Sequence, residues 1–134
     1  MSVCQEIDEF TKAIGATAPT AGDAQFFMWK QILKRPNYFR FLKNLMIVKI
    51  SRLEKPFWGV GKPYIDLFNE HCNDYYLVLL AGDGSGWVFR KAQVNSMVEN
   101  GTWKEAKDNN YKMNTPLPDS YHFHSANDFL NRHC

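Results

Sequence analysis

The chain has 134 residues, a length typical of a single domain. Hydrophobic residues make up 45% of it and aromatic residues 15%, which excludes an intrinsically disordered chain. The formal net charge of +2 excludes a polyelectrolyte that binds its partners through bulk charge alone.

The cysteine pattern and the first residues bear on the cellular compartment. Cys4, Cys72 and Cys134 are odd in number and far apart, and no Cys-x-x-Cys pair is present. This spacing favours reduced thiols over a disulfide framework or a zinc site. The N-terminal residues MSVCQEIDEF lack the basic and apolar segments of a secretion signal, and no apolar run approaches the roughly 18 residues that span a bilayer. We expect a cytoplasmic protein with no membrane partner.

The first third of the chain predicts two helices. Ile7, Phe10 and Ile14 recur at helical spacing, and the small residues after them predict a linker. A second apolar stripe predicts a helix from about Ala24, which Pro36 ends. We predict residues 1–21 to be a helix and linker appended to the domain.

A hairpin and a helix are predicted next. Two apolar, β-branched and aromatic runs, Tyr38–Leu42 and Leu45–Arg52, flank Lys43-Asn44 and predict two strands. The second run is apolar on both faces as far as Lys49, which is typical of a strand inside its sheet. Pro63 suits the first turn of a helix, because the N–H group that proline lacks needs no partner there.

The second half of the chain continues with alternating element types. Strands at Tyr75–Ala81 and Trp87–Phe89 flank a glycine-rich turn, in which Asp83 is a turn residue, and a helix follows at Ala92–Val98. A hairpin turning at Asn109-Asn110 and a last helix after Ser125 complete the chain. Helices and strands mix without a regular βαβ order. The sequence therefore predicts a single α+β domain over residues 1–134, with a mixed or antiparallel sheet of about 4–6 strands flanked by helices.

The stretch Gly59-Val60-Gly61-Lys62 raises the question of a phosphate-binding loop. A P-loop needs a glycine five residues before Gly61 and a hydroxyl side chain after Lys62. Pro56 and Pro63 occupy these two positions. The sequence therefore excludes a P-loop and predicts a tight turn between a strand and a helix.

A basic segment without acids runs from Ala24 to Leu53. Basic groups interleaved with aromatic ones suit nucleic acid, because cations meet phosphates and rings stack on bases. The alternative is that the aromatic side chains lie in the core and the basic ones form a solvated rim. The candidate nucleic-acid-binding residues are Lys30, Lys34, Arg35, Arg40, Lys43, Lys49 and Arg52.

The central part of the chain also carries a family resemblance. The strand IVKIS, which holds Lys49, comes before a helix and the long segment YYLVLLAGDGSGWVFRKAQVNSMVENGTW. This order resembles the restriction-endonuclease-like fold of the PD-(D/E)XK family, in which a strand ending in an acid-x-lysine motif precedes a helix and another strand. The resemblance implies a nuclease with Lys49 as its motif lysine. The acid position holds Ile47, however, and the preceding segment from Ala24 has no carboxylate to bind a divalent cation.

A non-catalytic member of that family and an unrelated α+β fold both fit this pattern. The small size also resembles proteins carried on bacterial mobile gene cassettes. Trp58, Lys62 and Trp87 are candidate pocket residues, and no catalytic residue, metal ligand or cofactor is predicted. His122 and His124 lie on one side of an extended segment, without a second close pair of ligands.

These observations lead to two functional hypotheses. The first is a non-catalytic binding or interaction protein that forms a homo-oligomer through aromatic-rich strands. The second is a degenerate nuclease-like protein that binds nucleic acid or another anionic partner.

Overall fold

The computed structural model describes residues 2–20 and 37–133. In these ranges it has four α-helices and eight strands, and the α+β class predicted from the sequence is confirmed. The elements, in chain order, are α1 (Val3–Ile14), β1 (Tyr38–Phe41), β2 (Asn44–Ser51), β3 (Phe57–Gly61), α3 (Lys62–His71), β4 (Tyr75–Ala81), β5 (Gly86–Arg90), α4 (Lys91–Glu99), β6 (Lys104–Glu105), β7 (Asn110–Asn114), the 3₁₀ helix η1 (Asp119–Tyr121), β8 (His122–Phe123) and α5 (Ala126–His133).

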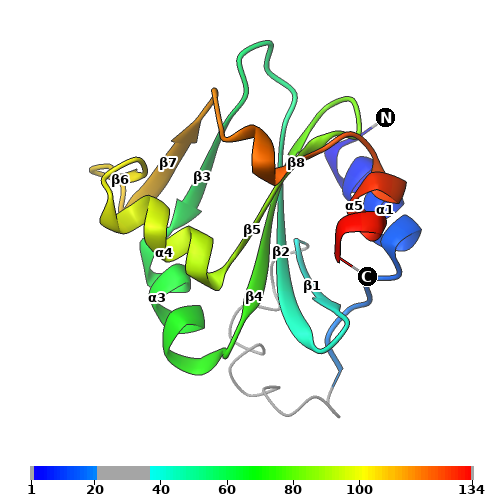
Figure 1. The fold of residues 1–134 in the computed structure, drawn as a ribbon, viewed down its shortest axis with the longest axis horizontal. Coiled ribbons are helices and arrows are strands. Elements are labelled where there is room, and N and C mark those ends of the chain that lie inside the picture. The colour runs from blue at the N-terminus through cyan, green and yellow to red at the C-terminus, as the bar shows by residue number, and fades with distance from the viewer. Residues whose placement is uncertain (1, 21–36, 134) are drawn as a thin grey trace.

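The strands form two sheets. The central sheet has five strands in the order β1-β2-β4-β5-β8, and a second sheet has three in the order β3-β7-β6. In the central sheet β2 and β4 are parallel, whereas the other pairs are antiparallel. The central sheet is therefore mixed, as predicted. Figure 1 shows α3, α4 and the second sheet on one side of it and α1 and α5 on the other.

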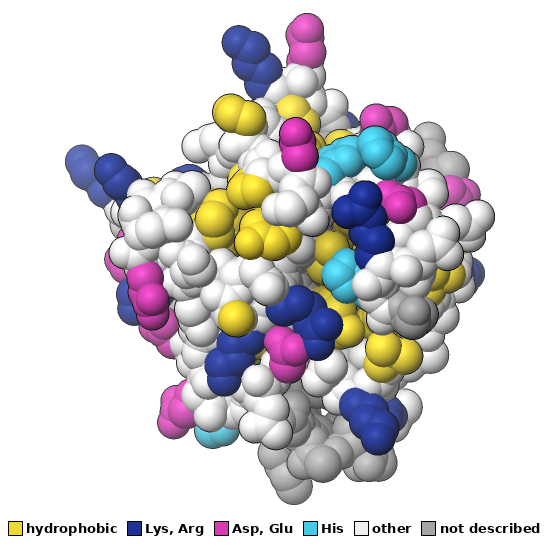
Figure 2. Space-filling view, viewed as in Figure 1, with side chains coloured by type: hydrophobic (Ala, Val, Ile, Leu, Met, Phe, Trp, Pro, Cys, Tyr) yellow, Lys and Arg dark blue, Asp and Glu magenta, His cyan; other side chains and the backbone are white. Residues whose placement is uncertain are grey.

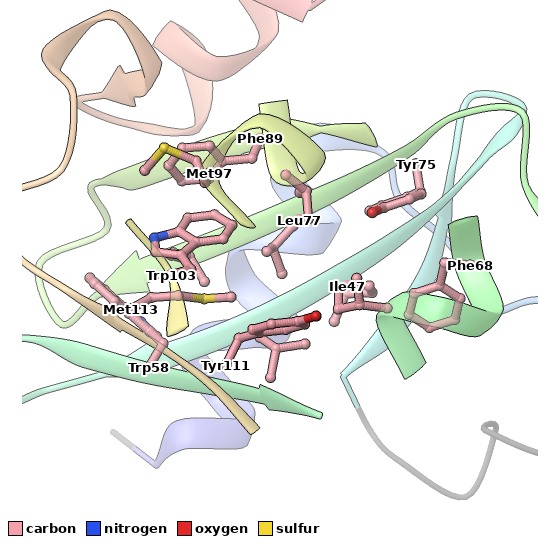
Figure 3. Close-up of a cluster of buried hydrophobic side chains, with 14 of the residues drawn as sticks. Ile47, Trp58, Phe68, Tyr75, Leu77, Phe89, Met97, Trp103, Tyr111 and Met113 are labelled. Atoms are coloured by element: carbon pink, nitrogen blue, oxygen red, sulfur yellow. The ribbon is translucent and has the colours of Figure 1, made fainter. Parts of the chain in front are cut away.

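The side between the two sheets holds the larger hydrophobic cluster. Side chains of β2 and β4 that point to this side meet α3, α4 and the second sheet, as Figure 3 shows for Ile47, Leu77 and Phe68. Trp103, from the loop after α4, is buried in the same cluster, with its ring centroid 4.8 Å from that of Phe89. Bulky aromatic side chains such as Trp103 and Phe89 thus fill the space between the two sheets.

The opposite side of the central sheet holds the second cluster. Ile7, Phe10 and Ile14 of α1 are buried there with Phe123 and Phe129. The predicted stripe of α1 is thus confirmed, but α1 is an integral part of the fold and not an appended segment. The reason is that the stripe covers one face of the central sheet, which would otherwise be open to water.

Local signals explain where α1 begins and ends. The Ser2 hydroxyl accepts a hydrogen bond from the Gln5 N–H, and the Gln5 side chain accepts one from the Ser2 N–H. Gly15 ends the helix with a positive φ of 79°. Thr17 then pairs with Arg40 at the outer edge of β1, so the linker also contributes to the central sheet.

The strands and helix predicted between Tyr75 and Val98 are confirmed, but the tight turn predicted at Gly59 and Gly61 is wrong. They do not form a tight turn; they lie in strand β3, where they pair with Lys112 and Asn110 of β7. A Cβ atom on Gly61 would lie 2.8 Å from the ring of Tyr64, so the strand tolerates no side chain there without a shift. The helix predicted to have Pro63 in its first turn is confirmed as α3, which ends at His71. The helix predicted from Ala24 lies outside the described residues.

Within residues 2–20 and 37–133, no helix combines the length and the apolar character needed to cross a bilayer.

Candidate functional site

A cavity of about 450 Å³ lies at one end of the central sheet. Three segments surround it: α1, the turn between β4 and β5, and the residues that lead into α5. Figure 1 shows these segments beside one another, close to the N-terminal end of the described chain. The volume falls within the range of small-molecule sites in proteins.

The floor of the cavity is apolar. Phe10 and Ala13 come from α1, Ile50 from β2, Leu80 from β4 and Ala126 from the first turn of α5. Phe10 and Leu80 also belong to the second hydrophobic cluster, so the cavity opens directly onto the core. An apolar part of a ligand would lose water by packing against these side chains.

Carboxylates stand around this floor. Glu6 and Glu9 of α1 and Asp83 of the β4–β5 turn line the cavity. Arg52 Nε donates a 2.6 Å hydrogen bond to Glu6 Oε2, so this carboxylate already has a cationic partner. Of the three carboxylates, Glu9 and Asp83 are therefore better placed than Glu6 to pair with a cationic ligand.

Asp83 is held in place by its own turn. Its Oδ1 accepts hydrogen bonds from the Ser85 hydroxyl at 2.5 Å and from the Ser85 N–H at 3.0 Å. These bonds, helped by the nearby His122, lower the pKa of Asp83 against a smaller opposing effect of burial. The predicted turn role of Asp83 is confirmed. The carboxylate is ionised at neutral pH, and the two hydrogen bonds from Ser85 fix its orientation.

The last side of the cavity is built by the start of α5. Ser125 Oγ accepts the N–H of Asp128 at 3.2 Å, and Asp128 Oδ2 accepts the N–H of His124 at 2.8 Å. This geometry makes Ser125 the N-cap of α5, and the helix begins directly after it, as predicted. His124 also lines the cavity, and its ring centroid is 4.8 Å from that of His122.

The chain matches no family model, no curated protein and no solved structure. The site must therefore be interpreted from its own geometry. Among the residues that the structure describes, no group of three or more His, Cys, Asp or Glu side chains is arranged to hold a metal ion.

The candidate pocket residues from the sequence lie elsewhere. Trp58 and Trp87 are brought together, with ring centroids 5.7 Å apart, but Trp58 is 2% exposed and fills the space between the two sheets. Its indole N–H donates to the Leu80 carbonyl oxygen at 3.0 Å. Lys62 begins α3, and its Nζ donates to Asp66 Oδ2 at 2.8 Å. None of these three residues lines the cavity described above.

The candidate nucleic-acid-binding residues are divided between two ends of the central sheet. Arg40 is exposed on β1 and Lys43 is exposed in the β1–β2 turn, so these two share one end. Arg52 follows the far end of β2, about eight residues or 26 Å along the strand, and is paired with Glu6. Lys49 is half-buried within β2. Lys30, Lys34 and Arg35 lie outside the described residues.

The strand that resembles the nuclease motif occupies the middle of the central sheet. Ile47, at the position of the motif acid, is fully buried in the larger hydrophobic cluster. Lys49 lies two residues further on the same side of β2. Ile47 thus makes hydrophobic contacts at the position where the nuclease motif has a metal-binding carboxylate.

Sequence reasoning missed the cavity as a site. Its lining comes from four separate segments of the chain and includes small residues such as Ala13, Gly82 and Ala126, which carry no chemical signal. The only local hint was the acidic residue in the glycine-rich turn, Asp83.

Proposed function

We propose that this chain is a non-catalytic binding protein whose ligand occupies the cavity between α1, the β4–β5 turn and the start of α5. The ligand class is an organic cation with an apolar body, such as an amine carried on a ring. The observation that supports this class is the combination of an apolar floor with two carboxylates, Glu9 and Asp83, at the rim.

The electrostatics of Asp83 favour binding over proton transfer. A general acid or base works best when its pKa lies near the operating pH. The Ser85 hydrogen bonds instead move the pKa of Asp83 downward, away from neutrality. A carboxylate that stays ionised is suited to hold a positive charge.

Three ligands of nearly the same shape test this proposal. Phenethylamine is cationic at pH 7, phenethyl alcohol is neutral and phenylacetate is anionic. We expect phenethylamine to bind with a dissociation constant on the order of 0.1–1 mM, as befits a ligand of about nine heavy atoms. The alcohol should bind several-fold more weakly, and the acid should not bind. Equal affinity of all three ligands would refute the ligand class, and no binding of any of them would refute the site.

A pair of variants on one helix localises the charge effect. Glu9→Gln removes a carboxylate that lines the cavity, whereas Asp8→Asn removes an exposed neighbour that does not. We expect Glu9→Gln to weaken phenethylamine binding about threefold, because an exposed charge pair contributes less than roughly 1 kcal/mol. Asp8→Asn should leave the affinity unchanged. The same loss in both variants would indicate only a long-range charge effect.

Nucleic-acid binding is the second candidate, and the β1–β2 hairpin is the observation that favours it. Arg40 and Lys43 lie at the same end of this hairpin, and Leu42 between them is 56% exposed with a φ of 56°. Two cations and an exposed apolar side chain at one end of a hairpin suit a contact with phosphates and bases.

Homo-oligomerisation and a cytoplasmic location belong to the same proposal. Leu53 and Phe57, at either end of the β2–β3 connection, are 55% and 47% exposed and offer apolar area to a second copy. Sedimentation over a wide concentration range tests this, and a monomer at high micromolar concentration would remove it. The cytoplasmic location is supported by the odd number and wide spacing of the cysteines, which favour reduced thiols.

A further inference from the structure

A second and smaller cavity lies on the edge of the central sheet, between α4 and α5. Its volume is about 100 Å³, and none of its lining residues lines the first cavity. Its lining includes Arg90, Gln93, Ser120, Arg132 and His133. Figure 2 shows Lys and Arg side chains with a His beside them near the middle of this face.

Arg90 is fixed in this place by two contacts. One Nη2 hydrogen bond joins it to Asp74 Oδ2, and its guanidinium carbon lies 4.1 Å from the ring centroid of Tyr76. Its Nε is buried and has no hydrogen-bond partner among the described residues. An arginine has five N–H donors, so Arg90 keeps donors for a further acceptor.

Arg132 and His133 bring two more nitrogen groups to the same cavity from α5. Arg132 Nε donates to Asp128 Oδ1 at 3.3 Å. Within residues 2–20 and 37–133 its two terminal nitrogens have no hydrogen-bond partner, so they can serve a further acceptor. The His133 ring packs against Tyr76 and Phe129, with centroids 6.0 and 4.8 Å away. The two guanidinium groups and the imidazole come from two elements, β5 and α5, and line one cavity.

The charged groups around His133 affect its pKa and the binding of an anion beside it. Burial is the largest cause that lowers the pKa of His133, and repulsion by Arg90 and Arg132 lowers this pKa further. The acids on these elements, Asp74 and Asp128, face the two arginines rather than the imidazole. A bound anion would share the two guanidinium groups with Asp74 and Asp128 and would relieve the repulsion that Arg90 and Arg132 exert on a protonated His133.

We propose that this cavity is a binding site for a tetrahedral oxyanion, the phosphate group. Its volume is about three times the share of one water molecule in the liquid, which suits a single phosphate and not a nucleoside. Arg90 and Arg132 provide forked donors for its oxygens, and Ser120 and the amide N–H groups of Gln93 are the neutral donors.

A neighbouring groove makes it possible to distinguish a phosphate monoester from free phosphate as the ligand. This open groove has a volume of about 550 Å³, shares Arg90 and Gln93 with the phosphate cavity, and is further lined by Asn73, Lys91 and Asn95. A phosphate monoester could place its organic part in this groove. Tighter binding of ribose 5-phosphate than of inorganic phosphate identifies a monoester as the ligand, and equal binding identifies the free ion.

The site is tested by titrating sodium sulfate into the protein at constant ionic strength, with calorimetry as the readout. Sulfate does not titrate near neutral pH, so its own charge stays constant. Arg132→Gln removes a cation that lines the cavity and is exposed enough to leave folding intact, whereas Lys107→Gln removes an exposed cation of the β6–β7 turn. We expect saturable binding that Arg132→Gln weakens roughly tenfold and Lys107→Gln leaves unchanged. No saturation, or equal effects of the two variants, would overturn the site.

The His133 imidazole supplies an independent readout. A bound dianion beside it should raise its pKa, so sulfate should bind more tightly as the pH falls from 8 to 5.5. An NMR titration of His133 with and without sulfate measures this directly. An unchanged pKa of His133 at saturating sulfate would place the anion elsewhere and overturn the proposal.

Discussion

The indole N–H of Trp58 donates a hydrogen bond to the carbonyl oxygen of Leu80, 3.0 Å away, and so joins the second sheet to strand β4 of the central sheet. Trp103 lies in the same hydrophobic cluster, but its indole N–H has no hydrogen-bond partner among the described residues. Both side chains are at least 98% buried. The two tryptophans are thus a matched pair that differ in one hydrogen bond.

We predict that Trp58→Phe lowers the free energy of unfolding by about 1–2 kcal/mol more than Trp103→Phe does. Both substitutions remove a similar volume from the core, but only the first leaves the Leu80 carbonyl without its donor. Urea unfolding of the two variants measures the difference. Equal losses in the two variants would show that the hydrogen bond contributes little.

Asp74 should make stability depend on pH. Burial raises its pKa, but hydrogen bonds from the N–H groups of Lys91 and Tyr75 and from the Arg90 guanidinium outweigh this and lower it below 3.8. A carboxyl with a lowered folded-state pKa stabilises the fold above its unfolded-state pKa and loses this contribution as the pH falls. We expect Asp74→Ala to cost about 1 kcal/mol at pH 7, a value reduced for partial exposure.

The cost of Asp74→Ala should shrink below pH 3.8, as the carboxyl of the wild-type protein becomes protonated. Unfolding curves at pH 7 and pH 3 measure it. A cost that stays constant between these pH values would contradict the ionic role of Asp74.

The buried Cys72 thiol should react slowly. Burial raises its pKa from 9.0 to about 11, with a small opposing effect of Lys91. Because the thiolate is the reactive form, we expect alkylation at pH 8 to be about a hundredfold slower than for an exposed cysteine. Iodoacetamide labelling of a Cys4→Ser/Cys134→Ser variant, followed by mass spectrometry, measures the rate. Native labelling as fast as labelling in urea would contradict this burial.

The β1–β2 hairpin carries the prediction on nucleic acid. If Arg40 and Lys43 contact two phosphates, the double reversal Arg40→Glu/Lys43→Glu should flatten the log–log salt dependence of duplex DNA binding by about two units. The reversal Lys104→Glu/Lys107→Glu on the β6–β7 hairpin is the control, since both of its side chains are exposed. A wild-type protein that DNA does not retain at low ionic strength would remove this candidate function.

Local patterns were enough for the elements that carry their own signal. The stripe of α1, the strand pair β1 and β2, and the strands β4 and β5 all follow from spacing within one short segment. Strand β3 was missed because Gly59 and Gly61 weaken the strand pattern, and only the pairing with β7, some fifty residues further on, creates it. Such pairings depend on the tertiary fold, which no local window contains.

The candidate sites show the same limit more strongly. Trp58 and Trp87 were predicted as pocket residues, but residue type alone does not distinguish a pocket tryptophan from one that is buried in the core, as Trp58 is. Arg90 and Arg132 are 42 residues apart in sequence, and nothing in either segment indicates that both line one cavity. Convergence of this kind becomes visible only when α5 is docked on the central sheet.

The most direct test of the proposed binding function is a ¹H–¹⁵N NMR titration with phenethylamine, recorded for the wild-type protein and for Ala13→Leu. Leucine at position 13 keeps the helix, since its helix propensity is close to that of alanine, and its larger side chain takes up part of the cavity that Ala13 lines. Our proposal predicts saturable shifts in α1, the β4–β5 turn and residues 124–126 of the wild-type protein, and their loss in Ala13→Leu. Shifts that do not saturate by about 10 mM, well above the expected dissociation constant, or that persist in Ala13→Leu, would contradict it.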